Sequence, residues 1–184
     1  MPTRPAHLPV VVCGGGIGGL AAALALVRRG LPVVVLEQAA ELGEIGAGMQ
    51  LGPNAFSALD ALGVGEAVRA RAVTTECLVM HDALDESLVG RIDTGEAFRR
   101  RFGNPYAVVH RADVHGALLD AVRAAGGVQL HTHTRVQRIE QDEAAGTVIA
   151  IDEQGRRHTG CALIGADGGK SVVRAQLVGD APRV

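Results

Sequence analysis

A cluster of glycines near the start of the chain constrains its fold more than any other feature. The short β-branched run 8–13 leads into Gly-Gly-Gly-Ile-Gly-Gly, in which Gly14, Gly16 and Gly19 match the spacing G-x-G-x-x-G. In a nucleotide-binding βαβ unit these glycines permit a tight turn, the close approach of a pyrophosphate and the packing of a helix on a strand. The apolar run itself is typical of a strand that is buried on both faces of a parallel sheet.

The segment after the glycines predicts the helix and the second strand of such a unit. Residues 17–29 carry apolar side chains at helical spacing and are followed by Gly30, as helices often are at their C-terminus. We expect residues 31–36 to form a strand, with Glu37 at its end, 23 residues after Gly14. A carboxylate there accepts hydrogen bonds from the ribose hydroxyls of an adenosine and repels a 2′-phosphate. The expected ligand is therefore FAD or NAD rather than NADP.

Composition favours a soluble globular protein that acts on small molecules. The net charge is −2 and aromatic residues make up 2% of the 184 residues, so basic surfaces and stacking platforms for nucleic acid are not expected. The apolar stretches are too short to span a bilayer, so we expect a cytoplasmic protein without a membrane partner. Cys13, Cys77 and Cys161 fit neither a disulfide framework nor a metal motif. We expect Cys13 to be a small buried residue rather than a reactive thiol.

Beyond the βαβ unit, the periodicity predicts paired helices, a hairpin and further strands. We expect a long loop at 38–52, an exposed connection at 95–105 and a helix at 111–125. The remaining predicted elements are helices at 53–62 and 65–72 and strands at 77–80, 88–92, 106–110, 128–130, 135–139, 147–152 and 157–164.

Two clusters have both a chemical and a simpler interpretation. The three arginines of 99–101 could hold an anionic substrate or the phosphates of a nicotinamide cofactor, but a run of charges is more often a solvated face. His131 and His133 would lie on one face of a strand, like a pair of metal ligands. Because carboxylates and cysteines at ligand spacing are missing nearby, we expect no metal site.

Four segments together resemble one family. The glycine unit and the segments 44–54, 110–114 and 165–174 occur in the order and at the separations seen in single-component FAD-dependent aromatic hydroxylases, the group A flavoprotein monooxygenases. The chain is most similar to the N-terminal part of the salicylate hydroxylase and 3-hydroxybenzoate 6-hydroxylase branch, over nearly its whole length.

The resemblance implies an α/β fold with a Rossmann-like FAD-binding domain at 1–73 and 106–184. This domain would contain a parallel sheet with flanking helices and an antiparallel β-meander. Residues 74–105 would begin the antiparallel sheet of a substrate domain, and the C-terminal remainder of the family fold would be absent.

The resemblance also implies which residues bind FAD. The segment 48–50 would pass beside the flavin, Arg111 would reach the pyrophosphate, and the adenine would lie against Val136. Asp167 would sit where FAD meets the passing nicotinamide cofactor, supported by Ser171 and Arg174. The complete set of expected FAD ligands is Gly14, Gly15, Gly16, Ile17, Gly19, Glu37, Gln38, Gly48, Gln50, Arg111, Val136 and Asp167. The catalytic residues stay unknown at this level.

The implied activity is hydroxylation of a phenolic aromatic acid, of the hydroxybenzoate or salicylate type, with O2 and with NADH in preference to NADPH. FAD carries the redox chemistry, and the protein binds it, excludes water and orients the ring. A homodimer is compatible with this predicted activity. Family members are about twice as long, beyond a typical single domain, so this chain alone is expected to be inactive. A non-catalytic nucleotide-binding module, an NAD-dependent dehydrogenase and a flavin reductase remain alternatives, since fold does not fix function.

Overall fold

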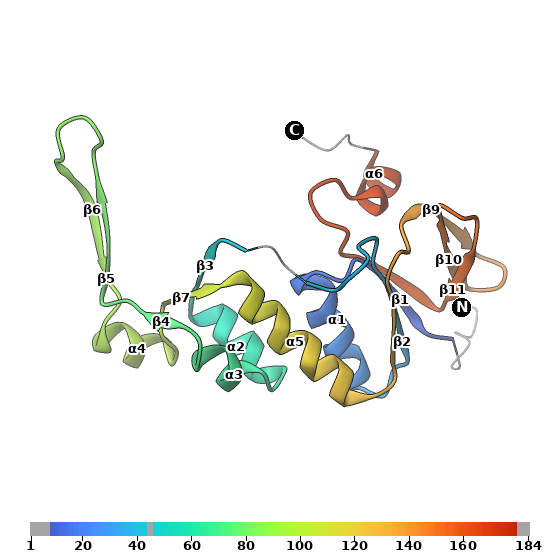
Figure 1. Cartoon of the computed structure of the whole chain (residues 1–184), viewed down its shortest axis with the longest axis horizontal. Helices are drawn as coiled ribbons and strands as arrows, with labels where there is room; N and C mark the ends of the chain where they lie inside the picture. The colour runs from blue at the N-terminus through green and yellow to red at the C-terminus, as the bar shows by residue number, and fades with distance from the viewer. Residues whose placement is uncertain (1–7, 44–45, 180–184) are drawn as a thin grey trace. The chain divides into compact units, whose positions relative to one another are not determined.

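A computed structural model describes residues 8–43 and 46–179 (Figure 1). The first two residues of the segment 44–54 lie outside the described part. The chain divides into two compact units. The first unit comprises Met1–Glu44 and Leu118–Val184, and the second comprises Ile45–Ala117.

The first unit is built on a four-stranded parallel sheet with the order β12-β1-β2-β8. Its strands end level with one another, because Cys13 pairs with both Gly165 and Leu36, and Leu36 pairs with His131. The four strands are β1 (Val10–Cys13), β2 (Val33–Leu36), β8 (Val128–His131) and β12 (Ala162–Gly165). The segments that follow them therefore leave the sheet at one common edge.

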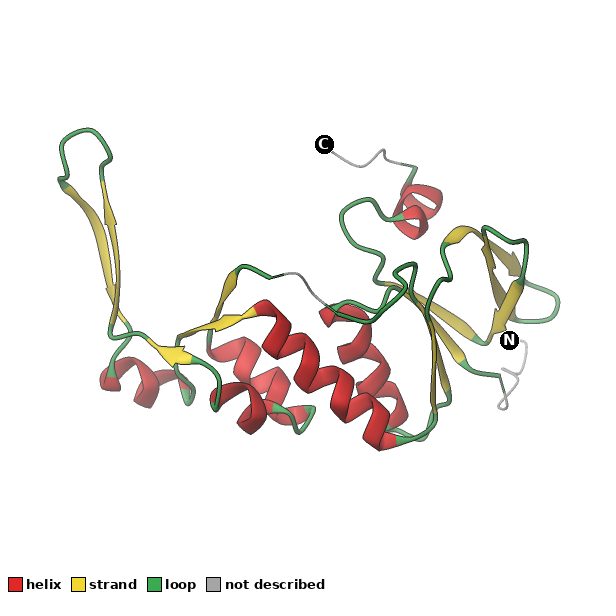
Figure 2. Ribbon diagram, in the orientation of Figure 1, coloured by secondary structure: helices red, strands yellow, loops and turns green. Residues whose placement is uncertain are grey.

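Both faces of this sheet are covered, as the apolar run predicted. Helix α1 (Ile17–Val27) packs on one face, and an antiparallel meander packs on the other (Figure 2). Val11 and Cys13 of β1 share a buried cluster with Ile139 and Ala150 of the meander. All four residues of β1 are at most 2% exposed. The meander strands are β9 (Val136–Asp142), β10 (Thr147–Asp152) and β11 (Arg157–Gly160).

The prediction of one strand over 157–164 is wrong. The segment is two strands in different sheets, because β11 pairs antiparallel with β10 whereas β12 pairs parallel with β1. The chain changes partner at Gly160, where a Cβ would lie 2.7 Å from the carbonyl oxygen of Pro9. The N–H of Cys161 then donates to the same oxygen at 2.9 Å. This close approach to the start of β1 redirects the strand.

The second unit contains a small antiparallel sheet, a hairpin and short helices. The sheet has the order β3-β7-β4, and β7 runs directly into helix α5 (Arg111–Ala125), which continues into the first unit. The strands of the unit are β3 (Gly48–Leu51), β4 (Val73–Thr74), β5 (Cys77–His81), β6 (Leu88–Asp93) and β7 (Ala107–His110). The other helices are α2 (Pro53–Ala61), α3 (Gly65–Arg69) and α4 (Glu96–Phe102).

Two predicted irregular segments contain regular structure. The loop expected at 38–52 includes β3, which pairs with β7, a strand almost sixty positions further along. The connection expected at 95–105 contains α4, which ends at Gly103 with φ of +75°. Pairs four residues apart stabilise α4: Glu96 with Arg100 at 3.0 Å, and the rings of Phe98 and Phe102 with centroids 4.6 Å apart.

The predicted hairpin is present as β5 and β6, paired from Cys77 with Asp93 to His81 with Leu88. Its assignment to a substrate domain stays a prediction. Among the described residues, no helix is both long and apolar enough to cross a membrane.

A buried carboxylate closes the meander. Asp152, 1% exposed, accepts hydrogen bonds from the backbone N–H groups of Gln154 and Arg156, both at 3.0 Å. Its other oxygen accepts from Arg156 Nε at 2.7 Å and lies 3.1 Å from His158 Nε2. Burial alone would raise the pKa of Asp152, but the bonds from His158, Arg156 and Gln154 outweigh it and lower that pKa to about 2.

We therefore expect Asp152→Asn to lower the free energy of unfolding by about 2 kcal/mol at pH 7. Because the folded-state pKa is depressed, this contribution is complete well above the unfolded pKa of 3.8 and is lost as the pH falls toward 2. Urea unfolding at pH 7 and pH 3 measures it, with Asp142→Asn at the exposed end of β9 as the control. If the wild type exceeded Asp152→Asn in free energy of unfolding by the same amount at both pH values, the lowered pKa of Asp152 would be contradicted.

Candidate functional site

Three segments emerge side by side at the carboxyl edge of the parallel sheet. The glycine turn after β1 lies between Glu37, which follows β2, and Ala166, which follows β12. The hydrogen bonds of the sheet continue past the strand ends, from Gly14 N–H to the oxygen of Leu36 at 2.8 Å and from Ala166 N–H to that of Cys13 at 2.7 Å. This is the edge at which open α/β sheets bind their ligands.

Main-chain packing explains two of the predicted glycines. Gly14 has φ of +109°, and a Cβ there would lie 2.2 Å from the carbonyl oxygen of Ala166. A Cβ at Gly19 would lie 1.9 Å from the oxygen of Gly14. At Gly18, a variable position of the fingerprint, a Cβ would meet nothing within 4 Å. The structure therefore requires glycine at the first and last fingerprint positions.

The glycine turn leads directly into the N-terminus of α1. Gly16 is the N-cap, and the first intrahelical bond runs from Leu20 N–H to the oxygen of Gly16 at 2.9 Å. Within the described chain, no side chain caps this end and its first turn carries no acidic residue. The N–H groups at the start of a helix have no intrahelical acceptors and carry the positive end of the dipole. The turn is therefore suited to a phosphate.

Glu37 lies beside this turn with its carboxylate held by two backbone donors. Oε2 accepts from Gly15 N–H at 2.6 Å, and Oε1 accepts from Ala39 N–H at 2.8 Å. Each carboxylate oxygen has a further acceptor site. Glu37 can therefore still accept further hydrogen bonds from an orientation that the backbone fixes, and its role toward ribose hydroxyls stays a prediction.

Asp167 is engaged with the start of α6 (Val172–Val178). Its Oδ1 accepts from Ser171 Oγ at 2.5 Å, and its Oδ2 accepts from the N–H groups of Val172 and Val173 at 2.8 and 3.2 Å. Ser171 Oγ in turn accepts from Arg174 N–H at 2.9 Å, which makes Ser171 the N-cap. The expected support of Asp167 by Ser171 is thus present, and the role of Asp167 toward a cofactor stays a prediction.

The other predicted ligands fall into two groups. Gly16, Ile17 and Gln38 belong to the same edge of the first unit, and Val136 begins β9 and packs on the buried cluster. The second group lies in the second unit and consists of Gly48, Gln50 and Arg111.

Local pairing brings the second group together. Gly48 pairs with His110, and the N–H of Arg111 donates to the oxygen of Ala47 at 3.2 Å. Gln50 Oε1 accepts from the hydroxyl of Tyr106 at 2.5 Å. Sequence reasoning missed this contact of Tyr106, because it depends on the unpredicted pairing of β3 with β7. The contribution of the group to FAD binding stays a prediction.

Cys13 is a buried structural residue. It is 1% exposed, and burial, followed by the negative charge of Asp167, raises the pKa of its thiol to about 12. The thiol is therefore protonated at neutral pH, and a nucleophilic role is not supported.

The expectation that His131 and His133 share a strand face is wrong. Strand β8 ends at His131, and His133 has φ of +49° in the following turn. Among the described residues, no group of three or more histidine, cysteine, aspartate or glutamate side chains could hold a metal ion.

Two of the three arginines of α4 form ion pairs, Arg99 with Glu76 and Arg100 with Glu96. This agrees with the interpretation of 99–101 as a solvated run of charges.

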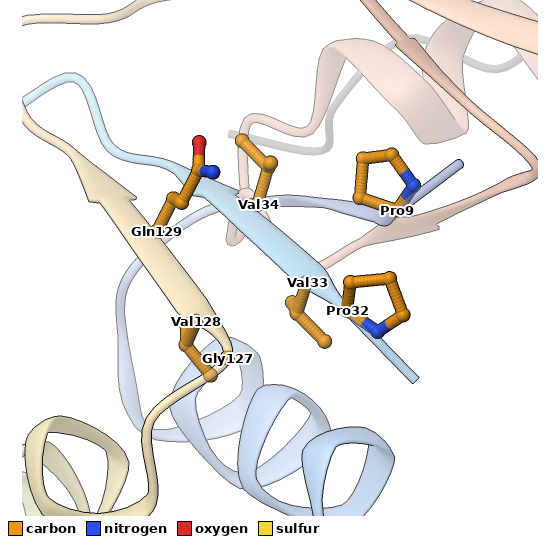
Figure 3. Close-up of a pocket in the computed structure, with 7 residues that line it drawn as sticks. All are labelled: Pro9, Pro32, Val33, Val34, Gly127, Val128 and Gln129. Atoms are coloured by element: carbon orange, nitrogen blue, oxygen red, sulfur yellow. The ribbon is translucent and has the colours of Figure 1, made fainter. Parts of the chain in front are cut away.

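A hollow of about 440 Å³ lies at the opposite edge of the same sheet (Figure 3). It is formed where β1, β2 and β8 begin, and its lining is largely apolar and contains no charged side chain. The residues that line it are Pro9, Pro32, Val33, Val34, Gly127, Val128 and Gln129. Because its lining carries no positive charge for a phosphate and it is at the amino edge, it is not the nucleotide site.

A family model described as the FAD binding domain matches residues 7–181. The chain belongs to the FAD binding domain family. The predicted choice of FAD as the bound nucleotide is thereby confirmed, as is the α/β class with a parallel sheet and an antiparallel meander.

Relatives with longer chains share this FAD binding domain. The 3-hydroxybenzoate 6-hydroxylase of Polaromonas naphthalenivorans (strain CJ2) is 68% identical over 184 residues, which are 100% of this chain and 46% of that protein. The protein of the same name from Klebsiella oxytoca is 53% identical and covers 95% of this chain and 43% of its own length. This chain therefore spans about half the length of the curated relatives it matches.

A solved structure has a similar fold. HpxO of Klebsiella pneumoniae, in complex with FAD and uric acid, matches 100% of this chain with a TM-score of 0.81 and 26% identity. The match covers 45% of the HpxO chain.

We expect Gly19→Ala to destabilise the FAD binding domain by about 1–3 kcal/mol, because the new methyl group would overlap the oxygen of Gly14. Gly18→Ala is the matched control, one position away in the same helix. It should be neutral or stabilise by up to about 1 kcal/mol, because its methyl group meets open space and alanine favours the helix. Urea unfolding of the ligand-free chain measures both, and equal effects would refute the packing argument.

Proposed function

We propose that this chain supplies the FAD-binding half of a monooxygenase that hydroxylates a phenolic aromatic acid of the hydroxybenzoate type, using NADH and O2. The observation that carries the proposal is the 68% identity, over all 184 residues, with a 3-hydroxybenzoate 6-hydroxylase. The carboxyl edge of the first unit supports it, because an uncapped helix start and an oriented carboxylate adjoin one glycine turn.

The residues at this edge fit the adenosine and pyrophosphate parts of FAD. The turn 14–16 and the start of α1 would hold the pyrophosphate, and Glu37 would accept the ribose hydroxyls. Val136 would contact the adenine, and Gln38 would flank the ribose. Gly48, Gln50 and Arg111, which belong to the second unit, would also bind FAD, as the resemblance to the hydroxylase family implies. When bound, FAD supplies the transfer of electrons from the nicotinamide to oxygen.

The side chains of this edge position a cofactor but do not form an acid–base pair. Both oxygens of Glu37 and both oxygens of Asp167 already accept hydrogen bonds within the chain. We therefore assign binding roles to these carboxylates and place the acid–base chemistry of hydroxylation in the remaining half of the relatives' length. On this proposal the 184-residue chain alone binds FAD and does not turn over.

Three further properties belong to the same proposal. NADH is preferred over NADPH, the enzyme acts in the cytoplasm, and subunits associate as homodimers. They rest on the resemblance to the hydroxylase family. Separately, the net charge of −2 gives no reason to expect a nucleic-acid or membrane partner.

We expect the 184-residue chain to bind FAD saturably and to bind NAD more weakly. Glu37→Arg should weaken FAD binding at least about tenfold, because it removes the acceptor for the ribose and for Gly15 N–H. Flavin fluorescence during titration measures the affinity. Glu41→Arg, the same charge reversal at an exposed position of the following loop, should bind as wild type. Preference for NAD, or equal losses in both variants, would defeat the proposed FAD site.

The activity is tested in a chimera in which these 184 residues replace the corresponding part of the Polaromonas relative. We expect 3-hydroxybenzoate to stimulate its NADH oxidation, with NADPH less effective. Asp167→Ala should lower both FAD content and stimulated oxidation, because the loop after β12 loses its bonds to α6. Asp142→Ala, an exposed carboxylate in the meander, is the control. A chimera that binds FAD but responds to no hydroxybenzoate would refute the substrate class.

A further inference from the structure

A glutamine of α6 occupies the free edge of the meander. Because the meander has the order β11-β10-β9, the outer edge of β9 faces no further strand. At Ile139 both backbone groups point to this edge, and the side chain of Gln176 binds both. Ile139 N–H donates to Gln176 Oε1 at 2.8 Å, and Gln176 Nε2 donates to the oxygen of Ile139 at 2.5 Å. The carboxamide thus completes the strand edge as a neighbouring strand would.

Helix α6 depends on a small number of such contacts. It has seven residues, which is too short for an isolated helix to be stable in water. Val173 anchors its first half in the buried cluster, at 4% exposure. In its second half, Leu177 and Val178 are 60% and 71% exposed. Among the described residues of this second half, Gln176 is the side chain that hydrogen-bonds another element.

The opposite end of α6 holds the segment that approaches the glycine turn. Asp167 is bound to the N–H groups of Val172 and Val173 and to Ser171 Oγ. The preceding residue, Ala166, packs against Gly14 so closely that a Cβ on Gly14 would lie 2.2 Å from its oxygen. A continuous series of contacts therefore runs from β9 through α6 and Asp167 to the glycine turn.

We propose that Gln176 is a positioning residue for the FAD site. By fixing α6 to β9, Gln176 holds the segment 165–171 in place beside the glycine turn. The effect on FAD affinity rests on the proposed function, whereas the effect on the order of the segment does not.

The bidentate contact requires a side chain that both donates and accepts. Methionine has a similar length but removes both hydrogen bonds, so Ile139 N–H and its oxygen lose their partner. A glutamate carboxylate can accept from Ile139 N–H but repels its oxygen, whereas a protonated glutamate restores the donor. Gln176→Glu should therefore act like Gln176→Met at pH 8 and approach the wild type as the pH falls to about 4, where a carboxyl with the ordinary glutamate pKa of about 4.3 is largely protonated.

Hydrogen exchange of the backbone amides in the ligand-free 184-residue chain provides the first measurement. In Gln176→Met we expect the amides of Ile139, Val172 and Val173 to exchange at least about tenfold faster, while those of β1 stay protected. Gln141→Met is the matched control, since Gln141 is exposed on β9 and its side chain forms no hydrogen bond in the described part of the chain.

FAD titration of the same variants provides the second measurement. The FAD dissociation constant should rise at least about threefold in Gln176→Met and in Gln176→Glu at pH 8, and remain unchanged in Gln141→Met. The FAD dissociation constant of Gln176→Glu, divided by that of the wild type at the same pH, should fall toward one at about pH 4. This pH-dependent rescue distinguishes positioning from a general loss of structure.

Several outcomes would overturn the proposal. Unchanged exchange at Val172 and Val173 would show that Gln176 does not hold α6. If the amides of β1 exchanged faster by the same factor as those of Val172 and Val173, Gln176 would have only a general structural role. Faster exchange at Val172 and Val173 with unaltered FAD affinity would show that Gln176 does not act on the FAD site. A wild-type chain that binds no FAD would defeat the proposed function and, with it, the role of Gln176 at the FAD site. The exchange data would still decide whether Gln176 orders the segment 165–171.

Discussion

Contact of main chain with main chain at the carboxyl edge is the constraint on which the rest of the first unit depends. Gly14 lies against Ala166, and Gly19 lies against Gly14, at separations that leave no room for a side chain. Strand β1 is bonded on both sides, to β12 and to β2. A displaced glycine turn would also break the bonds from Gly14 to Leu36 and from Ala166 to Cys13. The turn and the order of the strands therefore determine each other.

The central place of β1 explains its composition and the behaviour of Cys13. A strand with α1 on one face and the meander on the other must be apolar at every position, which its four residues satisfy. The last of these positions, Cys13, adjoins the glycine turn and is 1% exposed. Cysteine packs there as a compact apolar group, and its burial raises the pKa of the thiol and suppresses its reactivity.

The sequence predicted what is local and missed what depends on distant partners. The βαβ unit has a buried strand, a glycine turn, a helix and a terminal carboxylate in consecutive positions, and α5 begins and ends as its periodicity indicates. Strand β3 has no such pattern and exists because β7 pairs with it. The separation of β11 from β12 at Gly160 likewise depends on Pro9. Helix α4 differs, because its Glu96–Arg100 and Phe98–Phe102 spacings are visible locally, and the predicted connection at 95–105 did not take them into account.

The residues of the candidate site also divide into those that local sequence predicts and those that depend on distant partners. The fingerprint glycines and Glu37 could be found from spacing alone, because a βαβ unit fixes their separation. Gln176 could not, because its partner Ile139 is 37 positions away and contributes only backbone atoms, which leave no trace in the sequence. The groups suited to phosphate and ribose are held by the fold before any ligand arrives: the helix start by packing, and Glu37 by two N–H donors. Little conformational entropy then remains to be lost at this end when FAD binds. The loop carrying Asp167 is the exception, since short α6 holds it, and any adjustment of the first unit to its cofactor should therefore begin there.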